Sequence, residues 1–321
     1  MTLADKSTGY TQQGLEKQMS IARILDVGFW FLTLGLAIFA GFVLLWVIEQ
    51  TFQLSLPAIQ RFGLGFITGT TWDPVNNIFG VLPQIYGTLT TAGIAIVLAT
   101  PLGIGVAIFL TEGFAPKWVT TPITYAIELI VAVPSVVLGL WGIFILVPAI
   151  RPFFQFLNST FGWIPIFGGP DPRGNNLLIV GMVLSIMIVP IIISITRSTF
   201  EVLPRDLRTG SLALGATRWE TILKVLIPAG LSGIISGVML GLGRALGETM
   251  VAAMLVGNAN RIDISWLQPG STITALIANQ FGEAGRLQVS ALMYAGLVLM
   301  IMSLIVNILA EIIVRRFQNI E

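Results

Sequence analysis

The 321-residue sequence contains no cysteine and no histidine. Without cysteine, the chain can form neither a disulfide bond nor a reactive thiol. Without histidine, it lacks the commonest metal ligand and the side chain that titrates nearest neutral pH. A serine–histidine–acid catalytic triad is excluded for the same reason.

Charged residues are also scarce, at 10% of the chain, whereas soluble domains typically carry about 25%. The formal net charge of +1 leaves no basic excess, so we expect no nucleic-acid partner. Hydrophobic residues make up 55% of the chain, which leaves too little polar surface to cover a water-soluble fold. The composition therefore predicts a membrane protein.

Sequence signatures of catalysis and nucleotide binding are missing as well. No Gly-x-x-x-x-Gly-Lys-Ser/Thr phosphate loop, His-Glu-x-x-His motif or paired-carboxylate metal site occurs. We therefore expect no catalytic site, no cofactor and no metal in this chain. The energy for any transport must come from another subunit or from an ion gradient.

Six apolar runs are long enough to cross a hydrocarbon core, which takes about 20 helical residues. We predict an all-α membrane protein with six transmembrane helices in a single domain over residues 24–317, after a polar cytosolic tail at 1–23. The runs cover residues 25–48, 85–111, 121–149, 177–198, 228–257 and 289–314. The longer connections are expected at 50–84, 150–176 and 258–288 outside the cytosol and at 199–228 inside it.

Basic residues that flank the runs predict the orientation, because they are enriched on the cytosolic side. With the N-terminus in the cytosol, eleven basic residues fall inside and five fall outside, so both termini are expected to be cytosolic. The inside set is Lys6, Lys17, Arg23, Lys117, Arg197, Arg205, Arg208, Arg218, Lys224, Arg315 and Arg316. The outside set is Arg61, Arg151, Arg173, Arg261 and Arg286, and Arg244 lies within a span.

The cytosolic loop at 199–228 is amphipathic and should form two short helices. Gly215 permits a sharp bend between them, because glycine tolerates unusual backbone angles. Pro228 can begin the next span, where its missing N–H is not needed. Two apolar stripes carry the prediction: Leu207, Ser211, Leu212 and Leu214, then Trp219, Ile222, Leu223 and Leu226. The loop could lie on the lipid surface or dock a cytosolic partner.

The string "GLGRALGETM" at 241–250 places Arg244 and Glu248 inside an apolar run. A charge at mid-bilayer costs roughly 2.5–3.5 kcal/mol on insertion scales, so such residues face protein or water. On a helical wheel, both share one face with Gly233, Gly237 and Gly241, at spacings that let another helix approach closely. The charged face is thus expected to be the packed face.

Two interpretations of the pair remain open. Arg244 and Glu248, one helical turn apart, could form an internal salt bridge that only locks packing. Alternatively, Arg244 could bind a tetrahedral oxyanion through its planar fork of donors, with Glu248 orienting the fork and limiting affinity.

Two further candidates could line a pathway. Ser135 follows Pro134, which breaks the helical hydrogen bonding of the third run, although an ordinary proline kink would explain it too. Thr88 could line an entry path or simply bond to its own helix backbone.

Several strings carry a resemblance to a known family. "LALGATRWETILKVLIP" resembles the cytoplasmic loop of binding-protein-dependent ABC importer permeases, with Gly215 at the glycine position and Ile227–Pro228 at the end. Val225 replaces the expected isoleucine, and Thr209, Gly210 and Ser211 replace Glu-Ala-Ala. Four strings, at 79–112, 132–142, 241–250 and 271–284, are similar to the C-type membrane subunit of phosphate-specific importers.

The resemblance implies a MetI-like fold and a permease in the prokaryotic plasma (inner) membrane. It also implies a second homologous permease in a heterodimer, two ATPase subunits that bind ATP and Mg²⁺, and a soluble phosphate-binding protein. A coupling helix would seat in a groove of each ATPase. The candidate coupling residues are Arg208, Ser211, Leu214, Gly215, Ala216, Thr217 and Trp219. A permease for sulfate or molybdate, an ion-coupled secondary transporter and a scaffold subunit remain alternatives.

Overall fold

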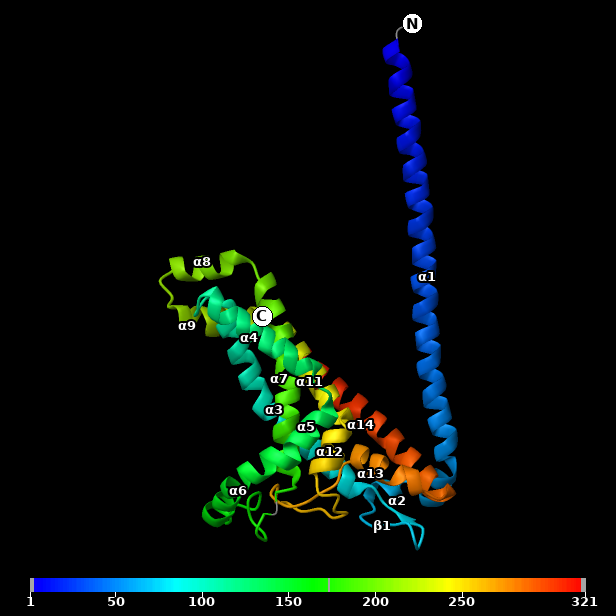
Figure 1. Ribbon diagram of the computed structural model, residues 1–321, viewed down its shortest axis with the longest axis vertical. Coiled ribbons are helices and arrows are strands. Elements are labelled where there is room, and N and C mark those ends of the chain that lie inside the picture. Colours follow the sequence, from blue (N-terminus) through cyan, green and yellow to red (C-terminus); the bar gives the residue numbers. More distant parts are fainter. Residues whose placement is uncertain (1–2, 173, 319–321) are drawn as a thin grey trace. The chain divides into compact units, whose positions relative to one another are not determined.

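The computed structural model describes residues 3–172 and 174–318, with side chains described over 26–312 apart from residue 173 (Figure 1). The chain divides into two compact units, Met1–Gln53 and Leu54–Glu321, which are described separately. Some members of the basic-residue count lie outside the described set: Arg173, and the side chains of Lys6, Lys17, Arg23, Arg315 and Arg316.

Helix α1 (Leu3–Phe62) contains the described residues of the first unit and extends beyond the helix end expected near residue 48. Its stretch Asp26–Phe62 is long and apolar enough to cross a membrane. The helix stops at Gly63, whose φ of +51° is the left-handed conformation that commonly closes a helix. The Gly63 N–H donates to the carbonyl of Ile59 at 2.8 Å.

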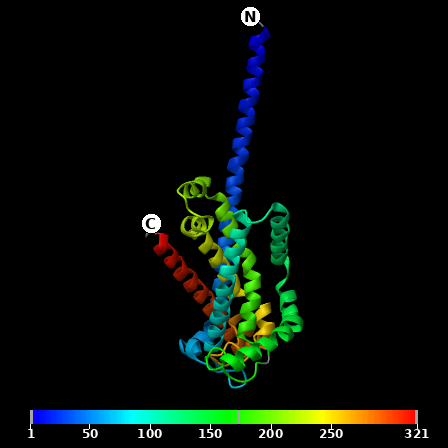
Figure 2. The same cartoon turned by 90° about the vertical axis from the view of Figure 1, so that its left-hand side faces the viewer.

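The second unit is built around α3 (Leu82–Thr111) and α7 (Leu177–Val202), which lie side by side (Figures 1 and 2). Glycine permits their close approach, because a Cβ at Gly181 would lie 2.5 Å from Ile94 Cγ2. A Cβ at Gly103 would similarly lie 2.6 Å from Cγ2 of Ile192. Buried alanines of α3 and branched side chains of α7 fill the rest of this core.

The third predicted run is broken rather than continuous. Helix α4 (Lys117–Ala132) is followed by extended Val133 and Pro134, and α5 (Ser135–Trp141) begins a new helix. Proline disfavours helical backbone in the residue before it, and Val133 accordingly has ψ of 123°. Helix α5 continues through a π-helical turn, η1 (Gly142–Leu146), into α6 (Val147–Phe161), so the long apolar stretch is Ser135–Phe161.

The fifth predicted run is also divided. Two segments, Arg218–Ala229 and Leu231–Gly247, meet at Gly230 and are bent by 69°. In the described part of the chain, five helices could each cross a membrane, or six if this bent pair counts as one span. The pieces are α9 (Arg218–Thr221), the π-helical turn η2 (Ile222–Leu226), α10 (Ile227–Ala229), α11 (Leu231–Gly247) and the separate α12 (Met250–Leu255).

Opposite ends of α7 carry different structures (Figures 1 and 2). One end carries α8 (Arg205–Ala213) and α9. The other carries an aromatic cluster in which Phe66 stacks on Tyr294 with ring centroids 4.4 Å apart. The elements at that end are α2 (Gly65–Thr68), the antiparallel pair β1 (Trp72–Asp73) and β2 (Ile78–Phe79), α13 (Ile273–Gln280), η3 (Phe281–Glu283) and the start of α14 (Arg286–Gln318).

Candidate functional site

Helix α11 packs through its glycines. A Cβ added at Gly233 would lie 2.0 Å from Thr199 Oγ1 of α7. Cβ atoms at Gly237 and Gly241 would lie 3.3 Å and 3.4 Å from the Cβ atoms of α7 isoleucines. The three small residues thus lie on the face that contacts α7, which is the arrangement expected for close helix packing in a membrane.

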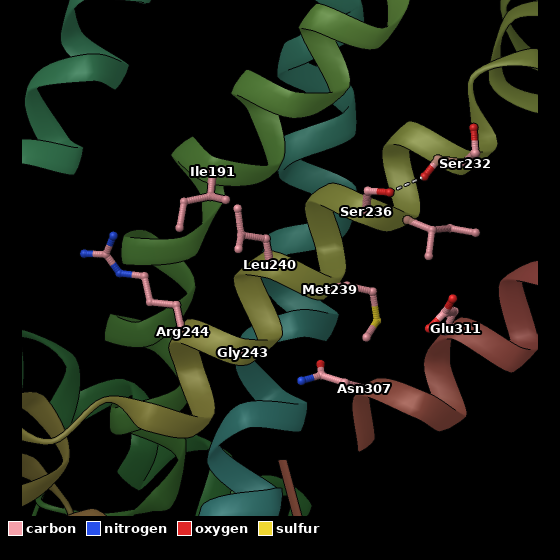
Figure 3. Close-up of a pocket in the computed structure, with 10 residues that line it drawn as sticks. Ile191, Ser232, Ser236, Met239, Leu240, Gly243, Arg244, Asn307 and Glu311 are labelled. Atoms are coloured by element: carbon pink, nitrogen blue, oxygen red, sulfur yellow. Dashed lines mark hydrogen bonds between the residues drawn. The ribbon is translucent and has the colours of Figure 1, made fainter. Parts of the chain in front are cut away.

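An open groove of about 930 Å³ follows the next face of α11, between α7 and α14 (Figure 3). Its lining residues are Ile191, Ser232, Ile235, Ser236, Met239, Leu240, Gly243, Arg244, Asn307 and Glu311. Four of these ten residues have apolar side chains, five have polar or charged ones, and one is glycine. A concave site that combines apolar side chains with several polar groups is typical of small-ligand sites.

Arg244 lies in the last turn of α11, at the boundary between the glycine face and the groove. Figure 3 shows its side chain extending on the side of Ile191, whereas Asn307 and Glu311 project from α14. Arg244 is half-buried, and among the described residues it makes no hydrogen bond or ion pair. The guanidinium, a fork of five donors, therefore remains available to a group from outside the described chain.

Glu248 does not share that face, because α11 ends at Gly247. Glu248 is extended, with φ of −69° and ψ of 125°. Its Oε1 accepts from the N–H groups of Met250 at 3.2 Å and Val251 at 3.4 Å, so the carboxylate caps α12. The wheel that placed Glu248 one turn beyond Arg244 is therefore wrong, since the helix does not continue.

The ion pairs found in the described region do not include Arg244 with Glu248. They are Arg151–Asp171, Arg197–Glu201, Arg208–Glu112 and Lys224–Glu220. The salt bridge considered as the structural alternative is thus not formed in this structure.

Thr88 and Ser135 lie away from the groove lining. Thr88 is buried, and its Oγ1 donates to the carbonyl of Gln84 at 2.8 Å and accepts from the N–H of Ile273 at 3.1 Å. It therefore joins α3 to the start of α13, in addition to bonding its own helix. Ser135 is half-buried at the first position of α5. Helix α5 packs on α12, where a Cβ at Gly139 would lie 2.6 Å from Met254 Sδ.

The polar groove residues Ser232, Ser236 and Asn307 were not among the residues predicted from the sequence. Two signals could have found them. Ser232 and Ser236 are one turn apart, and the Ser236 hydroxyl donates to the Ser232 carbonyl at 2.8 Å. Asn307 is an uncharged polar side chain within an otherwise apolar span, and Figure 3 shows it directed toward α11.

The loop that joins α7 to α10 forms the second candidate region. Helix α8 ends just before Gly215, whose φ of +87° turns the chain toward α9. A capping box begins α9: Glu220 N–H donates to Thr217 Oγ1 at 3.3 Å, and Thr217 N–H donates to Glu220 Oε2 at 3.0 Å. The expected two helices with a bend at Gly215 are thus present.

The candidate coupling residues divide into outward-facing and inward-facing sets. Leu214 is 91% exposed and Trp219 is 58% exposed, so the tip of the loop presents apolar side chains. Arg208 instead bonds Glu112, and Ser211 Oγ lies 3.0 Å from Thr221 Oγ1. Ala216 is half-buried beside Gly215, and Thr217 forms the capping box with Glu220.

The Glu220 carboxylate is strongly held in its charged form. Hydrogen bonds from the Thr217 N–H and hydroxyl, followed by Lys224, lower the pKa of Glu220 to about 2.

Over the described residues, no group of three or more His, Cys, Asp or Glu side chains could hold a metal ion.

Comparisons with known proteins agree on one family. A family model described as "Binding-protein-dependent transport system inner membrane component" matches residues 99–319. The phosphate transport system permease protein PstC of Xylella fastidiosa (strain Temecula1) is 42% identical over 300 residues, covering 91% of this chain and 92% of that protein. The Haemophilus influenzae protein of the same name is 43% identical over 269 residues, covering 83% of this chain and 85% of that protein.

Solved structures share the fold at low identity. A chain of a bacterial alginate ABC transporter matches with a TM-score of 0.61 at 16% identity, covering 89% of this chain and 94% of that chain. A chain of the inward-facing MetNI methionine ABC transporter matches with a TM-score of 0.53 at 16% identity, covering 74% and 95%. These matches support the MetI-like permease fold.

Proposed function

The chain belongs to the family of binding-protein-dependent transport system inner membrane components, and we propose that it is a permease subunit of an ATP-driven importer of inorganic phosphate. Its relatives of about 40% identity carry phosphate permease names over most of the chain. The structural observation that supports this cargo is the Arg244 guanidinium, which lies at the groove without a partner from the described chain.

Arginine suits this cargo for a chemical reason. Its planar fork can donate two parallel hydrogen bonds to a tetrahedral oxyanion, and it stays charged at physiological pH. The small polar groups of Ser236 and Asn307 lie along the same groove and would offer weaker hydrogen bonds to a passing anion. Weak secondary contacts suit transport, because a cargo that is held too tightly cannot be released.

Glu248 caps α12 and does not orient the Arg244 guanidinium, so we assign it a different role from the one expected from the sequence. The carboxylate fixes the turn between α11 and α12, directly after the turn that carries Arg244. We infer that Glu248 holds this end of α11 in position and contributes negative charge that limits anion affinity. Ser135 remains a predicted pathway residue at the α4–α5 break, whereas Thr88 serves mainly to join α3 to α13.

The groove also implies a partner. An open groove that carries an arginine cannot face lipid, because a charge in hydrocarbon must be covered by protein or water. Its rim includes Leu240, 59% exposed, and nearby Leu304 of α14 is 60% exposed. A second homologous permease that packs its own α11–α14 face here would close the pathway between the two subunits.

The other partners follow from the loop and from the family. Of the two ATPase subunits, which would hold ATP and Mg²⁺, one would dock on the loop tip of this chain at Leu214 and Trp219. This end carries Arg205, Arg208, Arg218 and Lys224, so it faces the cytosol in the proposed orientation, with both termini inside. A soluble phosphate-binding protein would deliver cargo at the opposite end.

Reconstitution of the candidate subunits in vesicles tests this function. Labelled phosphate should enter only when ATP is present on the ATPase side, and excess unlabelled phosphate should compete better than sulfate or molybdate. Uptake that follows an ion gradient without the ATPase would overturn the ATP-driven scheme. Stronger competition by sulfate or molybdate would instead reassign the cargo.

A further inference from the structure

The connection between α3 and α4 contacts both helices of the cytosolic loop, although Glu112 lies 96 residues before its partner Arg208 in the sequence. Glu112 follows α3 directly and pairs with Arg208 of α8. Phe114, two residues later, contacts Trp219 and Arg218 of α9. Gly113 between them has φ of +65°, a turn conformation that favours glycine.

The Glu112–Arg208 contact is partly buried and multiply bonded. The side chains are 9% and 24% exposed, respectively. Arg208 Nη2 donates to Glu112 Oε1 at 2.8 Å, and its Nε lies 3.2 Å from both carboxylate oxygens. Such a fork-to-carboxylate pair fixes the orientation of both side chains as well as their distance.

Arg208 also binds the end of α7. Its Nη2 donates to the carbonyl of Phe200 at 2.9 Å, and its Nη1 donates to the carbonyl of Leu203 at 3.4 Å. The last carbonyls of a helix lack partners within the helix, and a cation is favourable there. A single guanidinium therefore joins the ends of α3 and α7 to α8.

Phe114 makes the second connection, to α9. Its ring centroid lies 5.4 Å from that of Trp219, and the guanidinium carbon of Arg218 lies 5.0 Å from the Phe114 centroid. These distances are within the range of aromatic and cation–π attraction. Both loop helices are thus attached to the same three-residue segment.

We propose that Glu112 and Phe114 form a strut that transmits movement of the cytosolic loop to α3. The inference rests on the proposed function, in which ATPase subunits move this loop. Helix α3 packs tightly on α7 through Gly103 and Gly181, and both helices contact α11, which carries Arg244. The strut therefore lies on a continuous packed path from the loop to the groove.

A partly buried ion pair is weak evidence of a contribution to stability, because desolvation offsets much of its attraction. The structure instead assigns Glu112 and Arg208 to positioning, since their bonds fix α8 relative to two spans. Arg208 accordingly lies behind the docking tip. Its loss should uncouple ATP hydrolysis from transport without abolishing ATPase binding.

The first test measures phosphate transported per ATP hydrolysed by the reconstituted complex. Glu112→Gln should lower this ratio by about tenfold or more while the ATPase still co-purifies, because misplacing a positioning element impairs the step that it aligns. Glu201→Gln is the matched control: this carboxylate near the same end of α7 is 53% exposed and pairs with Arg197. A ratio in Glu112→Gln equal to that of Glu201→Gln and wild type overturns the strut.

The second test uses the absence of cysteine from the chain. The double variant Phe114→Cys/Trp219→Cys removes the aromatic contact, and a short bifunctional thiol reagent can replace it with a covalent link across the space that the two rings filled. Before cross-linking the transport ratio should fall, and after cross-linking it should recover. Recovery cannot come from a variant that fails to fold, whereas a cross-linked complex as impaired as the unlinked one, or more so, overturns the inference.

The two proposals fail in different ways. If the wild-type complex moves no labelled phosphate, the proposed cargo or driving force is wrong, and the strut is not the cause. If the wild type transports and every strut variant keeps the wild-type ratio, only the strut is wrong.

Discussion

Two half-buried arginines of this chain differ in whether their guanidinium groups have hydrogen-bond partners within the described chain. Arg208 uses its guanidinium on Glu112 and on the end of α7, whereas Arg244 makes no hydrogen bond or ion pair among the described residues. An arginine that is satisfied by its own chain builds local structure. One that lies unsatisfied in a span must be satisfied by water, by another subunit or by cargo, because its charge is costly in lipid.

The largest effect is expected at the unsatisfied arginine. Arg244→Ala should lower phosphate uptake by more than about 100-fold, because two charge-assisted hydrogen bonds to the anion are lost. The complex should still assemble, since Arg244 bonds no other described residue. Uptake of labelled phosphate and co-purification of the subunits measure the two outcomes.

Arg244→Lys sharpens the comparison, because lysine keeps the charge and loses the planar fork. Its uptake should lie between those of wild type and Arg244→Ala. Arg151→Ala is the matched control, since Arg151 is 51% exposed and lies 3.9 Å from Asp171 outside the groove. Normal uptake by Arg244→Ala would show that the anion does not use this guanidinium.

A smaller effect is expected at the bend of the cytosolic loop. Gly215 has φ of +87°, and a Cβ there would meet open space, so the cost of substitution is conformational rather than steric. Left-handed backbone costs a non-glycine residue roughly 1–2 kcal/mol, so Gly215→Ala should lower phosphate-stimulated ATP hydrolysis by about tenfold. Gly215→Trp, with a bulky side chain at the docking tip, should lower it further.

Gly210→Ala is the matched control for that prediction. Gly210 lies within α8, meets nothing within 4 Å and has no positive φ. Its substitution should leave ATP hydrolysis unchanged. Equal ATP hydrolysis in the Gly215 and Gly210 variants, with the ATPase still bound, would show that coupling does not depend on the bend at Gly215.

The glycine face beside Arg244 should affect stability more than function. A Cβ at Gly233 would lie 2.0 Å from Thr199 Oγ1, so Gly233→Ala must push α11 away from α7. Overpacking of this kind typically costs about 1–3 kcal/mol, which should lower the thermal unfolding midpoint of the purified complex by several degrees. Gly247→Ala, where nothing lies within 4 Å, should leave the midpoint unchanged, and equal midpoints would contradict close packing at Gly233.

The sequence predicted those features that depend on neighbours along the chain. The long apolar spans and the bend at Gly215 follow from local composition and glycine chemistry. The end of α11 does not follow from local composition, because Glu248 is held partly by Thr274, whose Oγ1 donates to the Glu248 carbonyl at 2.8 Å. Likewise, Arg208 turns inward because it pairs with Glu112. That partner lies 96 residues away in the sequence, and hydrophobic periodicity carries no signal for so distant a contact.

The smallest effect is expected at Glu220, a charge satisfied within the loop. Its pKa of about 2 lies below the ordinary value of 4.5, so the cap is fully formed above about pH 4.5 and is lost as pH falls toward 2. Glu220→Gln keeps an oxygen that can accept from Thr217 N–H, so hydrogen-exchange protection of α9 should fall only a few-fold at neutral pH. After correction for intrinsic exchange, wild-type protection should be constant between pH 7 and pH 5. A steep change near pH 6 would contradict the low pKa of Glu220 and would show that its carboxylate is not stabilised by Thr217 and Lys224.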